Sequence, residues 1–192
     1  MTISLSKGQG ISLSKSAPGL TAVAMGLGWD VAKKRGFFGG VKDGDPVDLD
    51  ASCLLFDAGG SLVDTVWFRQ LRSSDGSALH TGDNRTGDGD GDDEVINVRL
   101  NEVPSNIQTL VFTVNSFTGQ DFSTIENAFC RIVNMASNAE LARFNLTGAG
   151  PHTAQVMAKL FRKDGGWEFA AIGTTGNGRT FHDLLPIIQA AL

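Results

Sequence analysis

The sequence has 192 residues, of which 41% are hydrophobic, and its net charge is −5. This length and composition are typical of one domain with a substantial core, so we expect a single domain over residues 1–192. No run of 18 apolar residues is present, which excludes a transmembrane helix, and residues 1–15 lack the apolar stretch of a secretory signal. We therefore expect a cytoplasmic protein.

Alternating apolar and polar residues predict β-strands along most of the chain. The first two strands repeat the sequence ISLSK on either side of a Gly-containing link, which predicts a hairpin. Residues 134–138 and 164–166 predict two further hairpin turns. Residues 33–45, rich in Gly and charge, predict a loop that contains Phe37 and Phe38. The predicted strands are residues 3–7, 11–15, 23–29, 47–57, 62–71, 95–100, 109–114, 130–133, 141–146, 158–162 and 168–173.

Helix is predicted at two places only. Residues 121–129 favour a short helix, and the apolar residues after Thr180 follow the helical period. Thr180 and Asp183 have the spacing of a capping box, and Pro186 lies beyond the first turn. Many short strands with Gly-rich turns and little helix indicate an all-β sandwich or barrel with a C-terminal helix.

The excess negative charge is concentrated in residues 83–94. This segment contains six acids and one cation, Arg85, so its net charge is −5 and the other 180 residues sum to zero. Two carboxylates at 4 Å repel by about 1 kcal/mol in water and about 4 kcal/mol near a protein surface. The segment therefore stays open and solvated, or closes around a cation. Its glycines favour closing, because they permit the sharp turns through which successive carboxylates converge.

The ligands in this acidic segment favour calcium. Calcium binds six to eight oxygens in flexible geometry, whereas magnesium demands a small octahedron. The segment contains no Cys or His, so it suits zinc and copper poorly. It is not an EF-hand, because Asp93 stands where that loop needs Gly and Arg99 where it needs Glu. A mobile, solvated loop is the alternative that composition leaves open.

A second acidic pair, Asp48 and Asp50, lies at strand spacing in the sequence VDLDAS. Strand alternation places both side chains on one face, about 7 Å apart. Together with the acidic segment they supply more carboxylates than one calcium ion needs, so we expect two adjacent ions. Asp30, at the end of an earlier strand, is a weaker candidate ligand. The alternative for the pair is an ordinary surface strand edge.

Three blocks resemble the hallmark sequences of the TerD-like tellurium-resistance stress proteins: GLGWD (26–30), DLDAS (48–52) and GDNRTGDGDGDDE (82–94). The resemblance covers nearly the whole chain, and residues 36–40, 66–71, 103–131 and 178–186 resemble one branch of the family. It implies a two-sheet β-sandwich that binds calcium and acts in tellurite resistance with other proteins of the same system, near the inner membrane. The metal ligands that it implies are Asp48, Asp50, Asp83, Asn84, Asp88, Asp90, Asp92, Asp93 and Glu94.

The leading functional hypothesis is a calcium-dependent sensor or adaptor without catalysis. The alternative is a metal-dependent hydrolase or phosphate-processing enzyme, in which paired carboxylates act as acid and base and His80, His152 or His182 adds a base. No Walker loop, HExxH or nucleophile motif supports it. A third hypothesis is thiol chemistry on tellurite by Cys53 and Cys130. Both lie in apolar segments without CxxC spacing, which predicts buried, unreactive thiols.

Overall fold

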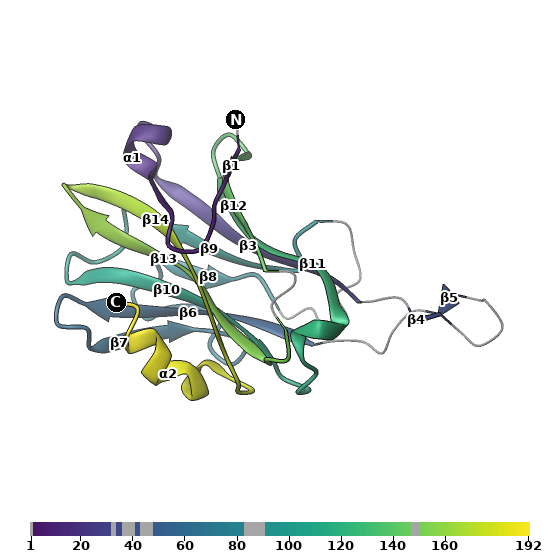
Figure 1. The fold of residues 1–192 in the computed structure, drawn as a ribbon. Helices are drawn as coiled ribbons and strands as arrows, with labels where there is room; N and C mark the ends of the chain where they lie inside the picture. Colours follow the sequence, from purple (N-terminus) through teal and green to yellow (C-terminus); the bar gives the residue numbers. More distant parts are fainter. Residues whose placement is uncertain (1, 32–33, 36–40, 43–47, 83–90, 147–149) are drawn as a thin grey trace.

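The computed structural model describes residues 2–31, 34–35, 41–42, 48–82, 91–146 and 150–192. Two six-stranded sheets face each other, which confirms the predicted β-sandwich (Figure 1). Sheet A has the order β1 (Ile3–Ser4), β12 (Ala139–Asn145), β11 (Ile125–Asn134), β3 (Ala22–Val31), β9 (Glu94–Arg99) and β8 (Ala78–His80). Sheet B has the order β2 (Gly10–Ser12), β14 (Gly166–Gly176), β13 (Ala154–Lys163), β10 (Ile107–Ser116), β6 (Leu49–Asp57) and β7 (Leu62–Val66).

The remaining elements are short. The strands β4 (Lys34–Arg35) and β5 (Val41–Lys42) pair with each other inside the segment predicted to be a loop, and Phe37 and Phe38 lie outside the described residues. The helices are α1 (Leu13–Ser16), the 3-10 turn η1 (Phe122–Thr124) and α2 (Phe181–Gln189). Among the residues that the structure describes, no helix has the length and apolar character needed to cross a bilayer.

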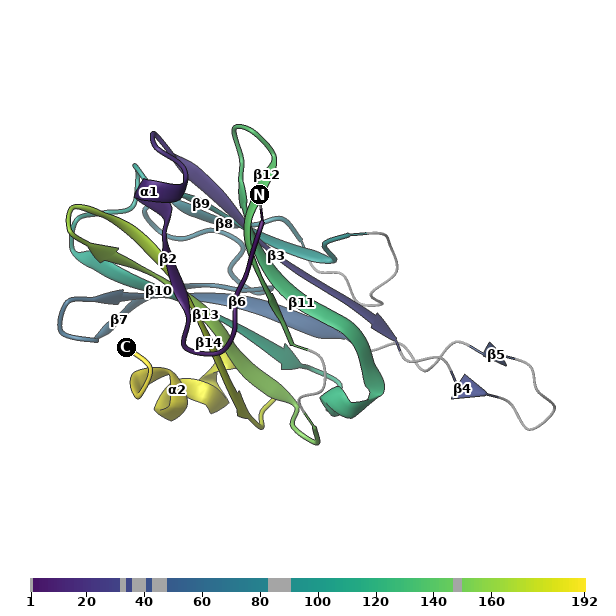
Figure 2. The same ribbon diagram turned by 45° about the horizontal axis from the view of Figure 1, so that its top comes forward.

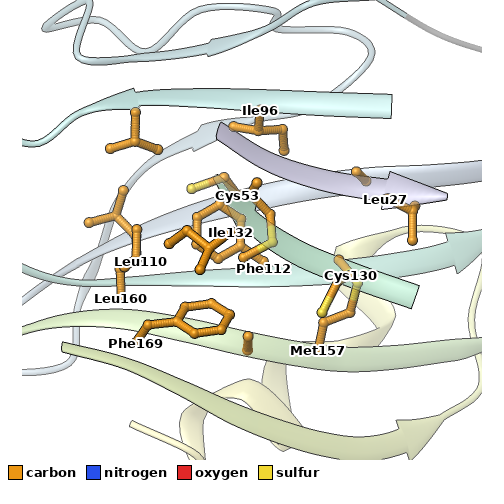
Figure 3. Packing of buried hydrophobic residues seen from close by; sticks show 14 of the residues in the cluster. Leu27, Cys53, Ile96, Leu110, Phe112, Cys130, Ile132, Met157, Leu160 and Phe169 are labelled. Carbon is orange, nitrogen blue, oxygen red and sulfur yellow. The ribbon is translucent and has the colours of Figure 1, made fainter. Parts of the chain in front are cut away.

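The main core fills the space between the two sheets. Because side chains alternate along a strand, Leu27 of β3 and Ile96 of β9 point inward from sheet A, and Phe112 points inward from sheet B (Figure 3). Met25 of β3 belongs to the same cluster. Each of these side chains is at most 2% exposed. Burial of apolar area at about 25 cal/mol per Å² is the dominant stabilising term for such a layer.

A second core lies on the outer face of sheet B, where α2 covers the strands (Figures 1 and 2). Leu184 and Ile188 of α2 pack there with Leu54 and Phe56 of β6. Because Cys53 and Leu55 of β6 face the main core, that strand is buried on both faces. The capping box of Thr180 and Asp183 is present as predicted, and the helix continues through Pro186.

The predicted N-terminal hairpin is wrong. The strand β1 pairs in parallel with β12 in sheet A, whereas β2 pairs with β14 in sheet B, so the chain crosses between sheets at Gly8. The second copy of ISLSK also leaves the strand conformation at Leu13, which begins α1. Repeated local sequence predicts two strands correctly but does not specify which neighbours they pair with.

The predicted helix at 121–129 is also largely wrong. The turn η1 ends after Thr124, and β11 begins at Ile125 and pairs with β3. Ile125 and Ala128 are buried three residues apart because the strand contains a β-bulge at Asn127, whose φ is +54°. A bulge inserts one residue and so imitates helical spacing in the sequence.

The acids of the GLGWD and DLDAS blocks and of residues 91–94 lie at one end of the sandwich, which we call the acidic end. Leu27 pairs with Glu94, Asp30 with Glu126, and Leu49 with Ser116. The strands β3 and β10 therefore finish where β6, β9 and β11 begin, at the end of the body that lies toward β4 and β5 (Figure 2). The GLGWD and DLDAS blocks and residues 91–94 all lie there.

Leu184 of α2 tests the second core. Leu184→Ala should lower the free energy of unfolding by about 2–5 kcal/mol, because it removes a fully buried side chain and leaves a cavity. The measurement is denaturant unfolding followed by circular dichroism. Leu62→Ala is the control, since Leu62 is 39% exposed and should change stability by less than about 0.5 kcal/mol. Equal effects would contradict packing of α2 on sheet B.

Candidate metal centre at the acidic end

The structure describes five of the nine predicted metal ligands. Asp83, Asn84, Asp88 and Asp90 lie outside the described residues. Asp48, Asp50, Asp92, Asp93 and Glu94 are at the acidic end, and no group of three or more metal-binding side chains occurs within the described ranges. Coordination by the nine residues therefore stays a prediction.

The acidic segment is the connection between β8 and β9, and protein hydrogen bonds hold both of its ends. At its start, the Thr81 N–H donates to the Val95 carbonyl at 2.9 Å, and the Gly82 N–H donates to Nδ1 of His80 at 3.1 Å. At its finish, the Asp93 N–H donates to the Leu27 carbonyl at 2.8 Å. The antiparallel pairing of β8 with β9 adds the register His80–Ile96.

The two glycines of GLGWD make room for the end of this segment on sheet A. A Cβ at Gly26 would overlap the carboxylate of Asp92. A Cβ at Gly28 would overlap the carbonyl of Gly91 and the ring of Phe129. Both glycines lie on the outer face of β3, so the sheet surface is flat where the chain crosses it. Gly91 itself has φ of +112°, which an L side chain rarely adopts.

Asp92 is clamped on the outer face of sheet A by Arg131 of β11. The guanidinium binds both carboxylate oxygens, with Nε–Oδ1 at 2.8 Å and Nη2–Oδ2 at 3.1 Å. Arg131 also contacts Glu140, which in turn binds Arg143, so two acids alternate with two arginines. Hydrogen bonds from Arg143 hold the pKa of Glu140 below its ordinary value, and burial opposes this only in part. Glu140 is therefore charged at neutral pH.

An open cavity of about 280 Å³ adjoins this clamp and borders Gly91. Asp30 lies at its rim, where its Oδ2 accepts a hydrogen bond from Nδ2 of Asn127 at 2.7 Å. The β-bulge in β11 directs Asn127 toward Asp30. The end of the acidic segment is therefore reachable by solvent and ions from the sheet A side.

Asp93 turns back onto β3. Its Oδ2 accepts a hydrogen bond from the backbone N–H of Trp29 at 2.9 Å. Burial raises the pKa of Asp93 above its ordinary value, the hydrogen bond from Trp29 lowers it, and the charges of Asp30, Asp92 and Glu94 raise it further. Repulsion among these carboxylates is thus only partly offset by protein donors.

Glu94 points between the sheets, on the inward face of β9. Its carboxylate is buried, and Oε2 accepts a hydrogen bond from the backbone N–H of Ala51 at 2.6 Å. Nε2 of His80 lies 3.4 Å from the same oxygen, and neither side chain is exposed to solvent. Glu94 therefore connects β9 of sheet A with β6 of sheet B, next to Asp50.

Asp50 lies on the other face of β6. It is 5% exposed and stands opposite Asn115 of β10, in the same row of outward residues as Leu54. Asp48 precedes the strand, and its carbonyl accepts a hydrogen bond from the N–H of Phe117 at 3.1 Å. The three acids Asp50, Glu94 and Asp92 thus start from a common end but lie on different sides of the sheets.

The other residues considered for chemistry, two histidines and two cysteines, pack against neighbouring side chains. His152 is buried against Phe122 with ring centroids 4.9 Å apart, and His182 stacks on Phe181 at 4.0 Å. Both cysteines are fully buried, as predicted, and point into the main core (Figure 3). Burial raises the pKa of Cys130 to about 12 and raises that of Cys53 further, so neither thiol ionises at neutral pH.

Comparison with known proteins follows the same blocks. The sequence profile of the TerD domain matches residues 1–185. The chain belongs to the TerD family. Tellurium resistance protein TerZ of Serratia marcescens is 50% identical over 99% of this chain and 98% of the relative, in agreement with the branch that the sequence blocks indicate. General stress protein 16U of Bacillus subtilis (strain 168) is 42% identical over 93% of each chain.

The fold of this TerD-family protein also matches a solved structure. The crystal structure of a homologue of telluride resistance protein (TerD) from Streptomyces coelicolor A3(2) aligns with a TM-score of 0.68 at 24% identity. The match covers 83% of this chain and 92% of the other, which supports the two-sheet arrangement.

Sequence reasoning missed Arg131 and the role of His80 in this site. Arg131 is 39 residues from Asp92 along the chain, and no local pattern distinguishes it from any other strand arginine. The sequence presents His80 only as a candidate base. The feature that could have indicated its role is its position as the last residue of β8, directly before the acidic segment.

Gly26→Ala tests the fit of Asp92 on sheet A. The added methyl should displace the Asp92 carboxylate from Arg131 and lower the free energy of unfolding by about 1–3 kcal/mol. Chemical denaturation measures the change. Ala24→Ser, on the same face of β3 one pair away, is the control and should have little effect. A Gly26→Ala protein of wild-type stability would show that Asp92 does not lie over Gly26.

The thiols provide a test of the tellurite-chemistry alternative. Cys53 and Cys130 should not react with a disulfide reagent such as 5,5′-dithiobis(2-nitrobenzoate) in the folded protein, because they are buried and protonated. Both should react rapidly in concentrated guanidinium chloride. The release of chromophore is the measurement, and rapid release from the native protein would restore thiol chemistry as a candidate function.

Proposed function

We propose that this TerD-family protein binds calcium, as two adjacent ions, at the acidic end and acts without catalysis as a metal-dependent sensor or adaptor in the tellurium-resistance stress response. The observation that carries the proposal is the anchoring of both ends of the acidic segment. Hydrogen bonds of His80 and Val95 fix its start, and Leu27 and Trp29 fix its end. Acids that follow one another closely in a segment with two fixed ends repel one another unless a cation neutralises them.

The donor chemistry at the acidic end suits calcium. All of the candidate ligands there are carboxylates and one amide, and calcium prefers oxygen ligands from flexible, irregular cages. Asp92 is already bound by Arg131 through both oxygens, so it serves this proposal best as an anchor of the segment. The ligands that would hold the ions are then Asp48, Asp50, Asn84 and the acids of the segment that precede Asp92.

A sensor or adaptor fits the chemistry better than an enzyme. His80 contacts Glu94, and His152 and His182 pack on aromatic rings, which leaves no histidine of the described chain placed as a base beside paired carboxylates. The relatives TerZ and general stress protein 16U are named for resistance and stress and not for a reaction. Two calcium ions would add four positive charges to the acidic end, which changes its electrostatic attraction for partner proteins.

The partners proposed are other proteins of the tellurium-resistance system, with which this protein would act in the cytoplasm, peripherally at the inner membrane. The added positive charge supports this, because a surface that repels an acidic partner or anionic lipid in the absence of calcium repels it less with calcium bound. The readout of the sensor is then association itself.

Calorimetric titration with calcium tests the proposal. Wild-type protein should bind calcium but not magnesium, and calcium at about 100 times Kd should raise the free energy of unfolding by about 2.7 kcal/mol for each bound ion. Asp50→Asn should weaken binding by about tenfold or more, a change of about 1.4 kcal/mol. Asp164→Asn is the matched control, because Asp164 lies in the distant β13–β14 turn.

Two outcomes would count against the proposal. An unchanged melting temperature after treatment with chelator, together with no heat of calcium binding, would leave the acidic segment as a solvated loop. Calcium-dependent hydrolysis of p-nitrophenyl phosphate, abolished in Asp50→Asn and retained in Asp164→Asn, would favour the enzyme instead.

A further inference from the structure

The Glu94 carboxylate accepts a backbone hydrogen bond that a neighbouring strand would normally accept. The last residue pair between β6 and β7 is Cys53–Val66, so Ala51 lies beyond the end of the β7 edge. Its backbone N–H donates to Oε2 of Glu94 at 2.6 Å instead. Because the carboxylate comes from β9, this hydrogen bond joins the two sheets. Bonds from backbone N–H groups to a buried carboxylate are charge-assisted and directional, unlike the apolar packing elsewhere in the sandwich.

His80 extends this connection to the acidic segment. Its Nδ1 accepts the hydrogen bond from the Gly82 N–H, which assigns the proton of the neutral ring to Nε2. Nε2 then faces Oε2 of Glu94 at 3.4 Å. The ring therefore joins the first backbone amide of the acidic segment to the carboxylate that holds Ala51. We call these groups the intersheet link: the side chains of His80 and Glu94 with the backbone N–H groups of Gly82 and Ala51.

We propose that His80 and Glu94 are positioning residues that set the distance between the acidic segment and the strand that carries Asp50. The inference rests on the proposed calcium site, for which the link supplies the geometry. Ligands that come from two different sheets must be held within about 0.5 Å of their binding positions. Two hydrogen bonds, Gly82 N–H to His80 and Ala51 N–H to Glu94, orient the link, because leaving a buried donor or acceptor unpaired is costly.

The placement of the link explains why a buried histidine and carboxylate are retained at this end. A buried acid paired with a neutral ring adds little to stability compared with apolar residues of similar volume. Its benefit is the fixed arrangement of the backbone on both sides: Gly82 begins the segment on sheet A, and Ala51 follows Asp50 on sheet B. Glu94 thus acts on the metal through the placement of other ligands.

Three variants test the intersheet link. His80→Phe keeps a ring of similar size but loses both nitrogens. His80→Gln keeps one acceptor and one donor and is the conservative rescue. Ser73→Ala is the matched control: Ser73 is buried, and its Oγ accepts the Ala78 N–H at 3.0 Å, at the end of β8 away from the acidic segment. The measurements are calcium Kd by calorimetry, melting temperature in chelator, and amide hydrogen exchange in the metal-free protein.

His80→Phe should weaken calcium binding by about tenfold or more and speed exchange of the Gly82 amide by a similar factor. His80→Gln should recover a large part of both. Ser73→Ala should lower the melting temperature but leave calcium Kd within about twofold. A residue with only a structural role would lower the melting temperature as Ser73→Ala does and leave Kd unchanged. Wild-type calcium affinity in folded His80→Phe protein overturns the proposal.

Failure of the calcium site is distinguishable from failure of the link. If wild-type protein shows no calcium binding, the proposed function fails and with it the positioning role in metal binding. Amide exchange in the metal-free variants then decides separately whether His80 holds Gly82. If His80→Phe does not fold, Glu94→Gln takes its place, because it keeps the shape and one acceptor for Ala51. Wild-type calcium affinity in Glu94→Gln overturns the proposal equally.

Discussion

Repulsion between like charges at one end of the sandwich is the constraint on which the local structure depends. The chain places Asp92, Asp93 and Glu94 in succession, and the structure separates them by giving each a different donor. Asp92 binds Arg131 on the outer face, Asp93 binds the Trp29 N–H at the strand end, and Glu94 binds the Ala51 N–H between the sheets. Strand alternation makes this possible, because successive side chains at a strand start point in different directions.

The same alternation attaches the last residue of the acidic segment, Glu94, to the interior of the sandwich. Once β9 begins, the inward positions belong to Glu94, Ile96 and Val98, and the core that holds the isoleucine and valine also holds the glutamate. The glycines of β3 complete the arrangement, since a side chain at Gly26 would prevent Asp92 from reaching Arg131. The same strands β3 and β9 therefore supply side chains to the core of the sandwich and fix the positions of the acids at its end.

Much of this was predictable from local pattern, and what was missed is non-local. Alternation correctly placed the core strands, and Thr180 with Asp183 correctly predicted the cap of α2. The ISLSK repeat failed because pairing partners are 130 or more residues away, as with Ile3 and Ala142. The helix at 121–129 failed because the bulge at Asn127 changes the burial period. Arg131 and Ala51 were missed for the same reason as the hairpin: only the fold brings them to Asp92 and Glu94.

Because the acids at the start of β9 point in different directions, hydrogen bonds connect the acidic end to both sheets. Through Asp92, Arg131 and Glu140, the segment is joined to the outer face of sheet A, which no helix of the described chain covers. Through Glu94 and Ala51, it is joined to β6, whose far face packs under α2. Under the proposed sensor function, the ion site would have to be coupled to surfaces that partners reach, and such coupling is carried by contiguous polar and packed groups. Because the two connections begin at Asp92 and Glu94, two residues apart at the start of β9, a displacement of this part of the chain affects both sheets at once.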